Sequence, residues 1–235
     1  MKIVGIQKLT LLDYPGRVAC TVFLDGCNFR CPYCHNAELL SGELEPVMSV
    51  EELLAFLKKR RGILEGVCIT GGEPTIHSGL PELLRAVRAL GYAVKLDTNG
   101  YRPEVLGQLL RDGLIDYVAM DLKNGPDAYP QTVGLAAPEM ERIAGSIRLL
   151  LDGGMEFELR TTVAKPLHSA ETLTSMADWL RRATGGRKVP RLFVQPVVDR
   201  DTVPVGGLSA PTAEELEQFL GILSACAERV EVRGT

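Results

Sequence analysis

The feature that most constrains this chain is a strand, loop and helix order that recurs along its length. Apolar β-branched runs predict strands, and amphipathic stretches with capping residues predict helices. The predicted strands cover residues 18–24, 67–70, 93–96, 117–120, 157–163 and 192–194. The predicted helices cover residues 49–61, 80–90, 103–111, 139–151, 170–182 and 213–227, and a short apolar tail covers 230–232. This alternation is typical of βαβ units that build a parallel sheet.

The number of units limits the architecture. Six strand-helix units are too few for a closed eight-stranded barrel, so we predict an α/β fold of the partial, open (βα)6 barrel type. A flat, doubly wound sheet is the alternative. The chain has 235 residues and shows no fixed-period repeat and no linker. We therefore expect one domain over residues 1–235.

Charge and hydropathy narrow the class of partner. The chain has 26 basic and 30 acidic residues and a net charge of -4, which gives no long-range attraction to nucleic acid or to an anionic membrane. No apolar run approaches the roughly 18 residues that a membrane span needs. We expect a cytoplasmic protein that binds neither nucleic acid nor membrane.

Polar residues gather where the predicted strands end. The carboxyl ends of parallel strands meet at one edge of a sheet, where binding sites are commonly built. The chain places its cysteine cluster after the first strand, Glu73 after the second, Asp97 and Thr98 after the third, Asp121 and Lys123 after the fourth, Arg160 within the fifth and Gln195 at the end of the sixth. One ligand at this edge could contact them all.

Three of the six cysteines form a cluster. Cys27, Cys31 and Cys34 have C-x3-C-x2-C spacing, whereas the other three stand alone in apolar segments. Thiolates suit zinc or iron-sulfur centres. A structural zinc site would need a fourth ligand. His35 is adjacent to Cys34, a poor arrangement for tetrahedral angles, and His77 and His168 are more distant candidates. Three cysteines on a four-iron cluster would leave one iron open to a small molecule.

Other polar groups suggest what could bind beside such a cluster. Gly71 and Gly72 let the backbone approach a ligand closely, and Glu73 can accept hydrogen bonds from an ammonium group. Asp97, Thr98 and Asp121 offer oxygen ligands for a hard cation, and Lys123 and Arg160 can bind a carboxylate. Each of these residues also has an ordinary structural explanation, such as a tight turn, a cap or a surface ion pair.

Taken together, these motifs resemble a known family, the radical S-adenosylmethionine enzymes, and within it the glycyl-radical-enzyme activases. The segment C-N-F-R-C-P-Y-C is similar to the family's C-x3-C-x-aromatic-C pattern, and G-G-E-P is similar to its methionine-binding motif. Residues 12–16 and 23–26 look like the activase entry sequence. The similarity is dense from about Gly5 to Lys123 and is greatest to the activases of anaerobic ribonucleotide reductase.

The resemblance implies a set of residue roles. Cys27, Cys31 and Cys34 would hold a 4Fe-4S cluster, and S-adenosylmethionine would chelate its fourth iron. Tyr33 would lie against the adenine, Gly71, Gly72 and Glu73 would hold the methionine amino group, and Lys123 or Arg160 would bind the carboxylate or ribose side. His168 would approach the adenosyl group. By similarity to a related activase, Asp97, Thr98 and Asp121 would bind a monovalent cation.

The resemblance also implies a reaction and its partners. The 5'-deoxyadenosyl radical would abstract hydrogen from a glycine Cα of a glycyl radical enzyme, with anaerobic ribonucleotide reductase as the expected target and a flavodoxin- or ferredoxin-like electron donor. The alternatives are activation of pyruvate formate-lyase, a radical reaction on a small molecule, or a non-enzymatic zinc or iron-sulfur module.

Overall fold

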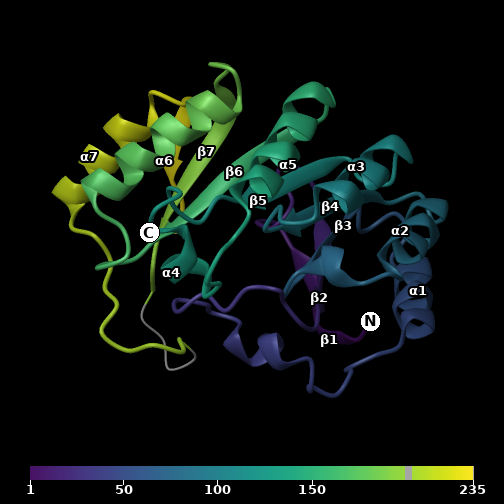
Figure 1. Ribbon diagram of the computed structural model, residues 1–235. Coiled ribbons are helices and arrows are strands. Elements are labelled where there is room, and N and C mark those ends of the chain that lie inside the picture. Colours follow the sequence, from purple (N-terminus) through teal and green to yellow (C-terminus); the bar gives the residue numbers. More distant parts are fainter. Residues whose placement is uncertain (199–202, 235) are drawn as a thin grey trace. The chain divides into compact units, whose positions relative to one another are not determined.

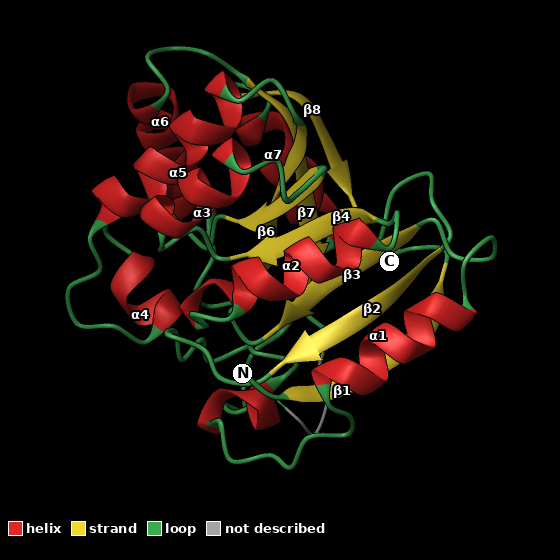
Figure 2. Ribbon diagram, turned by 90° about the vertical axis from the view of Figure 1, so that its right-hand side faces the viewer, coloured by secondary structure: helices red, strands yellow, loops and turns green. Residues whose placement is uncertain are grey.

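The computed structural model describes residues 1–198 and 203–234. Strands and helices alternate along these residues (Figures 1 and 2). The strands are β1 (Ile3–Thr10), β2 (Ala19–Leu24), β3 (Gly66–Gly71), β4 (Ala93–Thr98), β5 (Tyr117–Asp121), β6 (Glu156–Val163), β7 (Val189–Pro196) and β8 (Ala227–Val232). The helices are α1 (Val50–Lys59), α2 (Leu80–Ala89), α3 (Pro103–Arg111), α4 (Tyr129–Val133), α5 (Met140–Asp152), α6 (Ala170–Ala183) and α7 (Ala213–Leu223), with the 3-10 turns η1 (Ala37–Ser41) and η2 (Pro74–Ile76).

The sheet is mostly parallel, and its strands follow one another in chain order from β1 to β8. Strand β1 pairs antiparallel with β2, and β2 with β3, β3 with β4, β6 with β7 and β7 with β8 pair in parallel. The order starts at β1 and ends at β8, so the sheet is not closed. The predicted α/β fold class with an open sheet is therefore confirmed.

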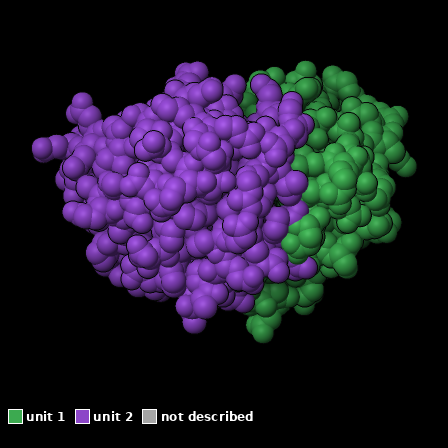
Figure 3. Space-filling model, turned by 45° about the horizontal axis from the view of Figure 1, so that its top comes forward, with its two compact units in different colours: residues 1–28, 38–98, 104–119 green, residues 29–37, 99–103, 120–235 purple. Residues whose placement is uncertain are grey.

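The described chain divides into two compact units, which Figure 3 distinguishes by colour. The first unit comprises residues 1–28, 38–98 and 104–119, and the second comprises residues 29–37, 99–103 and 120–235. The division assigns Cys27 to the first unit and Cys31 and Cys34 to the second. We describe each unit by itself below.

Helices α1, α6 and α7 each begin at a residue that caps the first turn. Ser49 accepts a hydrogen bond from the backbone of Glu52 at 3.1 Å, and the Glu52 side chain accepts one from the Ser49 backbone at 2.7 Å. Such a capping box satisfies two N–H groups that the first turn leaves without partners. Ser169 and Thr212 start α6 and α7 in the same way. These caps explain why the predicted starts of the three helices agree with the structure.

Strands β2, β3 and β4 of the first unit are largely buried, and helices cover them (Figure 2). Val22, Val67 and Leu96 have no exposed surface. The segment that resembles the activase entry sequence adds to this core, because the ring of Tyr14 packs against Tyr117 with 6.1 Å between centroids. It also fixes the first strand pair, since Asp13 accepts a hydrogen bond from the Thr21 hydroxyl at 2.5 Å.

The second unit has a core of its own between β6, β7 and helices α5 to α7. Leu159 and Leu192, which pair across β6 and β7, have no exposed surface, and neither has Leu180 of α6. Figure 1 shows α6 and α7 side by side. Burying each such side chain stabilises the fold by about 1.5–3 kcal/mol.

The structure differs from the sequence prediction at three places. Strand β1 was not predicted, because residues 7–9 are exposed and interrupt the apolar alternation. The last helix ends at Leu223, and the predicted tail 230–232 is part of the longer strand β8. Residues 124–138, between the predicted strand 117–120 and the predicted helix 139–151, contain the short helix α4 with Pro130 in its first turn. Within the described residues, no helix is long and apolar enough to cross a membrane.

Candidate functional site

The glycine-rich loop of the first unit follows β3 and lies against the end of β2. Gly71 has φ +122°, and a Cβ atom there would lie 2.2 Å from the carbonyl oxygen of Leu24. A Cβ on Gly72 would lie 1.8 Å from the carbonyl oxygen of Gly26. Two backbone hydrogen bonds hold the loop in place, from Gly72 to Leu24 at 2.9 Å and from Glu73 to Gly26 at 2.8 Å. Only glycine fits at both positions, and the contact places the loop beside the chain that leads into Cys27.

Glu73 is a buried carboxylate held by hydroxyl groups. It is 1% exposed, and its Oε1 accepts hydrogen bonds from the hydroxyl of Thr98 at 2.7 Å and from the hydroxyl and backbone N–H of Thr75 at 2.5 and 3.0 Å. The structure thus brings together two predicted site residues, Glu73 and Thr98, from the ends of neighbouring strands. A buried carboxylate in a fixed orientation is suited to accept hydrogen bonds from a cationic ligand.

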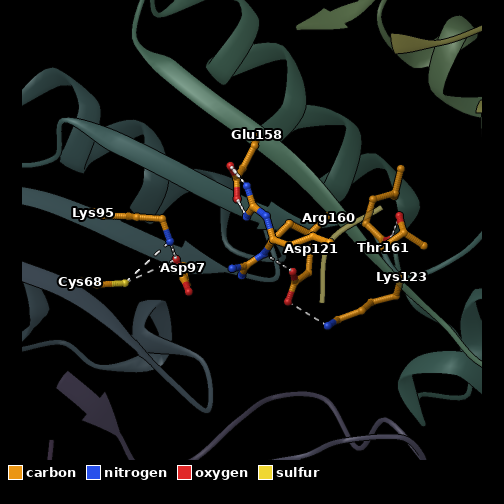
Figure 4. Close-up of polar contacts among 10 residues, drawn as sticks. Cys68, Lys95, Asp97, Asp121, Lys123, Glu158, Arg160 and Thr161 are labelled. Carbon is orange, nitrogen blue, oxygen red and sulfur yellow. Dashed lines mark hydrogen bonds and ion pairs between the residues drawn. The ribbon is translucent and has the colours of Figure 1, made fainter. Parts of the chain in front are cut away.

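Asp97 precedes Thr98 at the end of β4 and is also a predicted site residue. Its partner is a buried lysine. Lys95 forms an ion pair with Asp97, and its ammonium nitrogen lies 3.7 Å from Sγ of Cys68 (Figure 4). The sequence analysis did not single out Lys95. A signal was available, because residues two apart on a strand point to the same face and Lys95 stands between the apolar residues Val94 and Leu96.

In the second unit, Cys31 and Cys34 lie on one turn. The backbone N–H of Cys34 donates to the carbonyl oxygen of Cys31 at 3.1 Å. All six cysteines of the chain are thiols. Cys31 is buried, and burial raises the pKa of its thiol to about 11. The backbone of the neighbouring Arg30 donates to Val133 of α4 at 2.8 Å, which fixes the start of the turn.

Tyr33, His168 and Lys123 form a buried group beside this turn. The rings of Tyr33 and His168 meet edge to face at 6.0 Å, and the ammonium of Lys123 lies 6.0 Å from the centre of the Tyr33 ring. Nδ1 of His168 lies 3.1 Å from the backbone nitrogen and 3.2 Å from the carbonyl oxygen of Ala164, and Nε2 lies 2.8 Å from the carbonyl oxygen of Lys123. Burial lowers the pKa of His168, which keeps the ring neutral.

Two buried tyrosine hydroxyls in this unit lack hydrogen-bond partners among the described residues. They belong to Tyr33 and to Tyr129 of α4, whose side chains are 3% and 0% exposed. A buried hydroxyl without a partner costs about 1–3 kcal/mol. The sequence analysis missed Tyr129, because nothing in its segment distinguishes a buried tyrosine from one on a loop surface.

Asp121 is held between two cations (Figure 4). Lys123 and Arg160 each lie 2.9 Å from one of its carboxylate oxygens. Burial alone would raise the pKa of Asp121, but the two cations outweigh it and lower the pKa to about 2. Burial alone would lower the pKa of Lys123, whereas Asp121 raises it. The three predicted residues are therefore together, and all are charged.

The histidines of the chain have backbone partners. His35 lies 3.0 Å from the carbonyl oxygen of Val198, and Nε2 of His77 lies 2.7 Å from that of Asp25. His168 has the two backbone partners described above. These contacts give each histidine a structural role, and they do not favour a zinc site with a histidine ligand.

The chain is similar to proteins of one enzyme class. A family model described as the Radical SAM superfamily matches residues 21–180. A protein of Methanocaldococcus jannaschii named as a glycyl-radical enzyme activating enzyme is 35% identical over 185 residues, which is 75% of this chain and 74% of the relative. The pyruvate formate-lyase-activating enzyme of Clostridium pasteurianum is 30% identical over 198 residues, 81% of each chain.

A solved structure agrees at the level of fold. Native anSMEcpe with bound AdoMet aligns with a TM-score of 0.63 over 89% of this chain and 61% of that chain, at 17% sequence identity. The chain therefore belongs to the radical S-adenosylmethionine superfamily, the class that its open sheet, cysteine segment and glycine-rich loop define. More particularly, it is an enzyme of the glycyl-radical-enzyme activase family.

Enzymes of this superfamily use a 4Fe-4S cluster and S-adenosylmethionine as cofactors. The residues present fit both groups. Three thiols on an eight-residue segment are the donors that an iron-sulfur cluster requires. Gly71 and Gly72 have no room for a Cβ atom, because the loop lies against the backbone of Leu24 and Gly26 and is thereby held next to the chain that leads into Cys27. The hydroxyls of Tyr33 and Tyr129 are buried donors that still lack an acceptor among the described residues.

Proposed function

We propose that this enzyme generates the glycyl radical of anaerobic ribonucleotide reductase. The observation that carries the proposal is the cysteine segment with C-x3-C-x2-C spacing, found together with the loop Gly71–Glu73 in a chain of the activase family. When bound, the cluster and S-adenosylmethionine supply one-electron cleavage of the sulfonium and abstraction of a hydrogen atom. The protein supplies binding, orientation and exclusion of water.

The proposal assigns the cofactor contacts that the family resemblance implies. Cys27, Cys31 and Cys34 hold the cluster, with the fourth iron left for S-adenosylmethionine. In the first unit, the carbonyl groups of Gly71 and Gly72 and the carboxylate of Glu73 accept the hydrogens of the methionine amino group. The hydroxyls around Oε1 of Glu73 support this role, because they fix the carboxylate before the ligand arrives.

The second unit contributes the adenosyl contacts. Tyr33 lies against the adenine, and Lys123 or Arg160 binds the carboxylate or ribose side. The shared ion pair with Asp121 supports this arrangement, because it holds both cations in fixed positions. In this proposal His168 approaches the adenosyl group. Its ring contact with Tyr33 and its neutral charge support this role.

The identity of the target enzyme is the most specific part of the proposal. Pyruvate formate-lyase is the main rival, and the relative from Clostridium pasteurianum supports it as a second candidate. A flavodoxin- or ferredoxin-like protein in the cytoplasm would supply the electron in either case. A backbone glycine of a folded partner must reach the bound cofactors, and an open sheet suits a substrate of that size.

The test combines cluster chemistry with the partner. We expect the reconstituted, reduced protein to convert S-adenosylmethionine to 5'-deoxyadenosine, and Cys34→Ala to lose this activity together with bound iron. Cys226→Ala is the matched control, because Cys226 is buried in the turn between α7 and β8 and has no proposed ligand role. Iron content and product formation that survive in Cys34→Ala would contradict the ligand assignment.

The partner is identified by mixing the reduced enzyme and S-adenosylmethionine with each candidate and recording electron paramagnetic resonance spectra. We expect the doublet of a glycyl radical on anaerobic ribonucleotide reductase. A radical that forms only on pyruvate formate-lyase would overturn the choice of target and would leave the activase family assignment intact.

A further inference from the structure

The family resemblance suggests a monovalent cation, and the structure gives the expected cation ligands other partners. The ligands of the cation would be the carboxylates of Asp97 and Asp121 with the hydroxyl of Thr98. Each of these groups has a side-chain partner within its own unit. The Thr98 hydroxyl donates to Glu73 at 2.7 Å, and Lys123 and Arg160 lie 2.9 Å from Asp121. The question is what balances Asp97.

Lys95 is the residue that balances the charge of Asp97. The two residues stand two apart on β4, so both side chains leave the same face of the strand. The Lys95 side chain is 3% exposed and that of Asp97 is 14% exposed, and they form an ion pair. Figure 4 shows the Lys95 side chain turned toward the carboxylate.

The position of Lys95 is fixed from the neighbouring strand as well. Cys68 of β3 is the register partner of Lys95, and its Sγ lies 3.7 Å from the ammonium nitrogen and 3.7 Å from Oδ1 of Asp97. A buried ammonium is costly unless it is paired. Because the lysine is attached two residues from the carboxylate, is buried and contacts Cys68, its charge is present at Asp97 whatever the salt in solution.

We propose that the Lys95 ammonium replaces an alkali cation at Asp97, so that this enzyme binds S-adenosylmethionine without requiring Na⁺ or K⁺. An ammonium group carries the same single positive charge and donates hydrogen bonds where an alkali ion would accept oxygen ligands. A second cation beside Asp97 would be repelled by Lys95. The three predicted residues thus do not fit the cation, and the inference does not depend on which enzyme receives the radical.

The charge substitution is tested with Lys95→Met, which keeps the length of the side chain and removes its charge. Lys165→Met is the matched control, because Lys165 also forms an ion pair, with Glu215 at 2.9 Å, in the other unit. The reconstituted proteins are compared in sodium, potassium and choline chloride at one ionic strength. The readouts are the dissociation constant of S-adenosylmethionine and the thermal midpoint of unfolding, neither of which needs turnover.

We expect the wild-type enzyme and Lys165→Met to bind S-adenosylmethionine equally well in the three salts. Lys95→Met should bind about tenfold more weakly in choline than in sodium or potassium, because a free alkali ion then occupies the vacated position. The thermal midpoint of Lys95→Met should be higher by about 3 °C or more in sodium or potassium chloride than in choline chloride.

Two results would overturn the proposal. The first is a wild-type enzyme whose affinity for S-adenosylmethionine depends on sodium or potassium. The second is a Lys95→Met protein that behaves alike in all salts. The double variant Lys95→Met/Asp97→Asn removes both charges and should fold without salt specificity. If the double variant folds and Lys95→Met does not fold in any salt, an alkali ion cannot replace the lysine and the proposal is wrong.

Discussion

The hydroxyl of Thr98 donates a hydrogen bond to Oε1 of Glu73 over 2.7 Å, and both residues are buried. The bond joins the end of β4 to the loop after β3, and therefore two motifs that lie 25 residues apart in sequence. A carboxylate taken out of water needs such donors, because an unmade hydrogen bond to a buried charge is expensive. Thr98 is thus a support for Glu73, whatever else it contacts.

Replacement of Thr98 by valine should destabilise the enzyme. Valine has the shape of threonine but no hydroxyl, and the bond is made to a charged group, so the expected loss is about 1.5–3 kcal/mol of unfolding free energy. Thr98→Ser keeps the hydroxyl and loses one methyl group, for which about 1 kcal/mol is expected. Urea unfolding of both variants checks the difference. A valine variant as stable as the serine variant would show that the bond contributes little.

Alanine at position 72 should disrupt the glycine-rich loop. The new Cβ would lie 1.8 Å from a backbone carbonyl oxygen, which cannot move as a flexible side chain would. We expect more than about 3 kcal/mol of destabilisation or a protein that fails to accumulate in soluble form. Thermal unfolding and soluble yield are the measurements.

Gly221→Ala is the control for this prediction. Gly221 lies in α7, it is exposed, and a Cβ there would meet nothing within 4 Å. Alanine should stabilise the helix by up to about 1 kcal/mol, because it restricts the unfolded chain. Equal effects of the two substitutions would mean that the close contact at Gly72 is not present in solution.

The two buried tyrosines Tyr129 and Tyr92 should respond in opposite ways to loss of the hydroxyl. Tyr92 donates to the carbonyl oxygen of Leu57 at 2.7 Å, whereas Tyr129 has no partner among the described residues. We expect Tyr92→Phe to lose about 1 kcal/mol and Tyr129→Phe to gain about the same in the cofactor-free protein. Chemical denaturation of the two variants tests this. A Tyr129→Phe variant as destabilised as Tyr92→Phe would refute the assignment.

The sequence predicted those parts of the fold whose signals are local. The helix Pro103–Arg111 has the predicted bounds, and the start of α6 at Ala170 agrees because Ser169 is a capping residue. Strand β1 was missed because its position depends on pairing with β2. Its exposed residues Gln7 and Lys8 give no apolar pattern that a local reading could use.

The sequence predicted which residues belong to the candidate site, but it did not predict which of their charged side chains form ion pairs. The spacing of the cysteines and the G-G-E-P motif stand in the sequence. The pairing of Asp121 with Arg160 joins β5 to β6 across 39 positions, so it follows only from the folded sheet. The pairing of Lys95 with Asp97 is local, yet its burial is a tertiary property.

The cysteines should differ in reactivity according to burial. Cys20 and Cys226 have no exposed surface, and burial raises their thiol pKa to about 12 and about 11. A thiol reacts with an alkylating reagent as its thiolate, so both should be unreactive in the folded, cluster-free protein near neutral pH. Cys27 and Cys34 are partly exposed and should be modified first.

Iodoacetamide labelling followed by peptide mass spectrometry gives the order of reaction. Labelling of Cys20 and Cys226 should begin only when denaturant unfolds the chain. Raising the pH from 7 to 9 should not make the folded protein react at these two residues, because the pKa values of their thiols lie higher. Reconstitution with iron and sulfide should then protect Cys34. If Cys20 or Cys226 is alkylated in the folded protein as fast as Cys34, their assignment to the core is wrong.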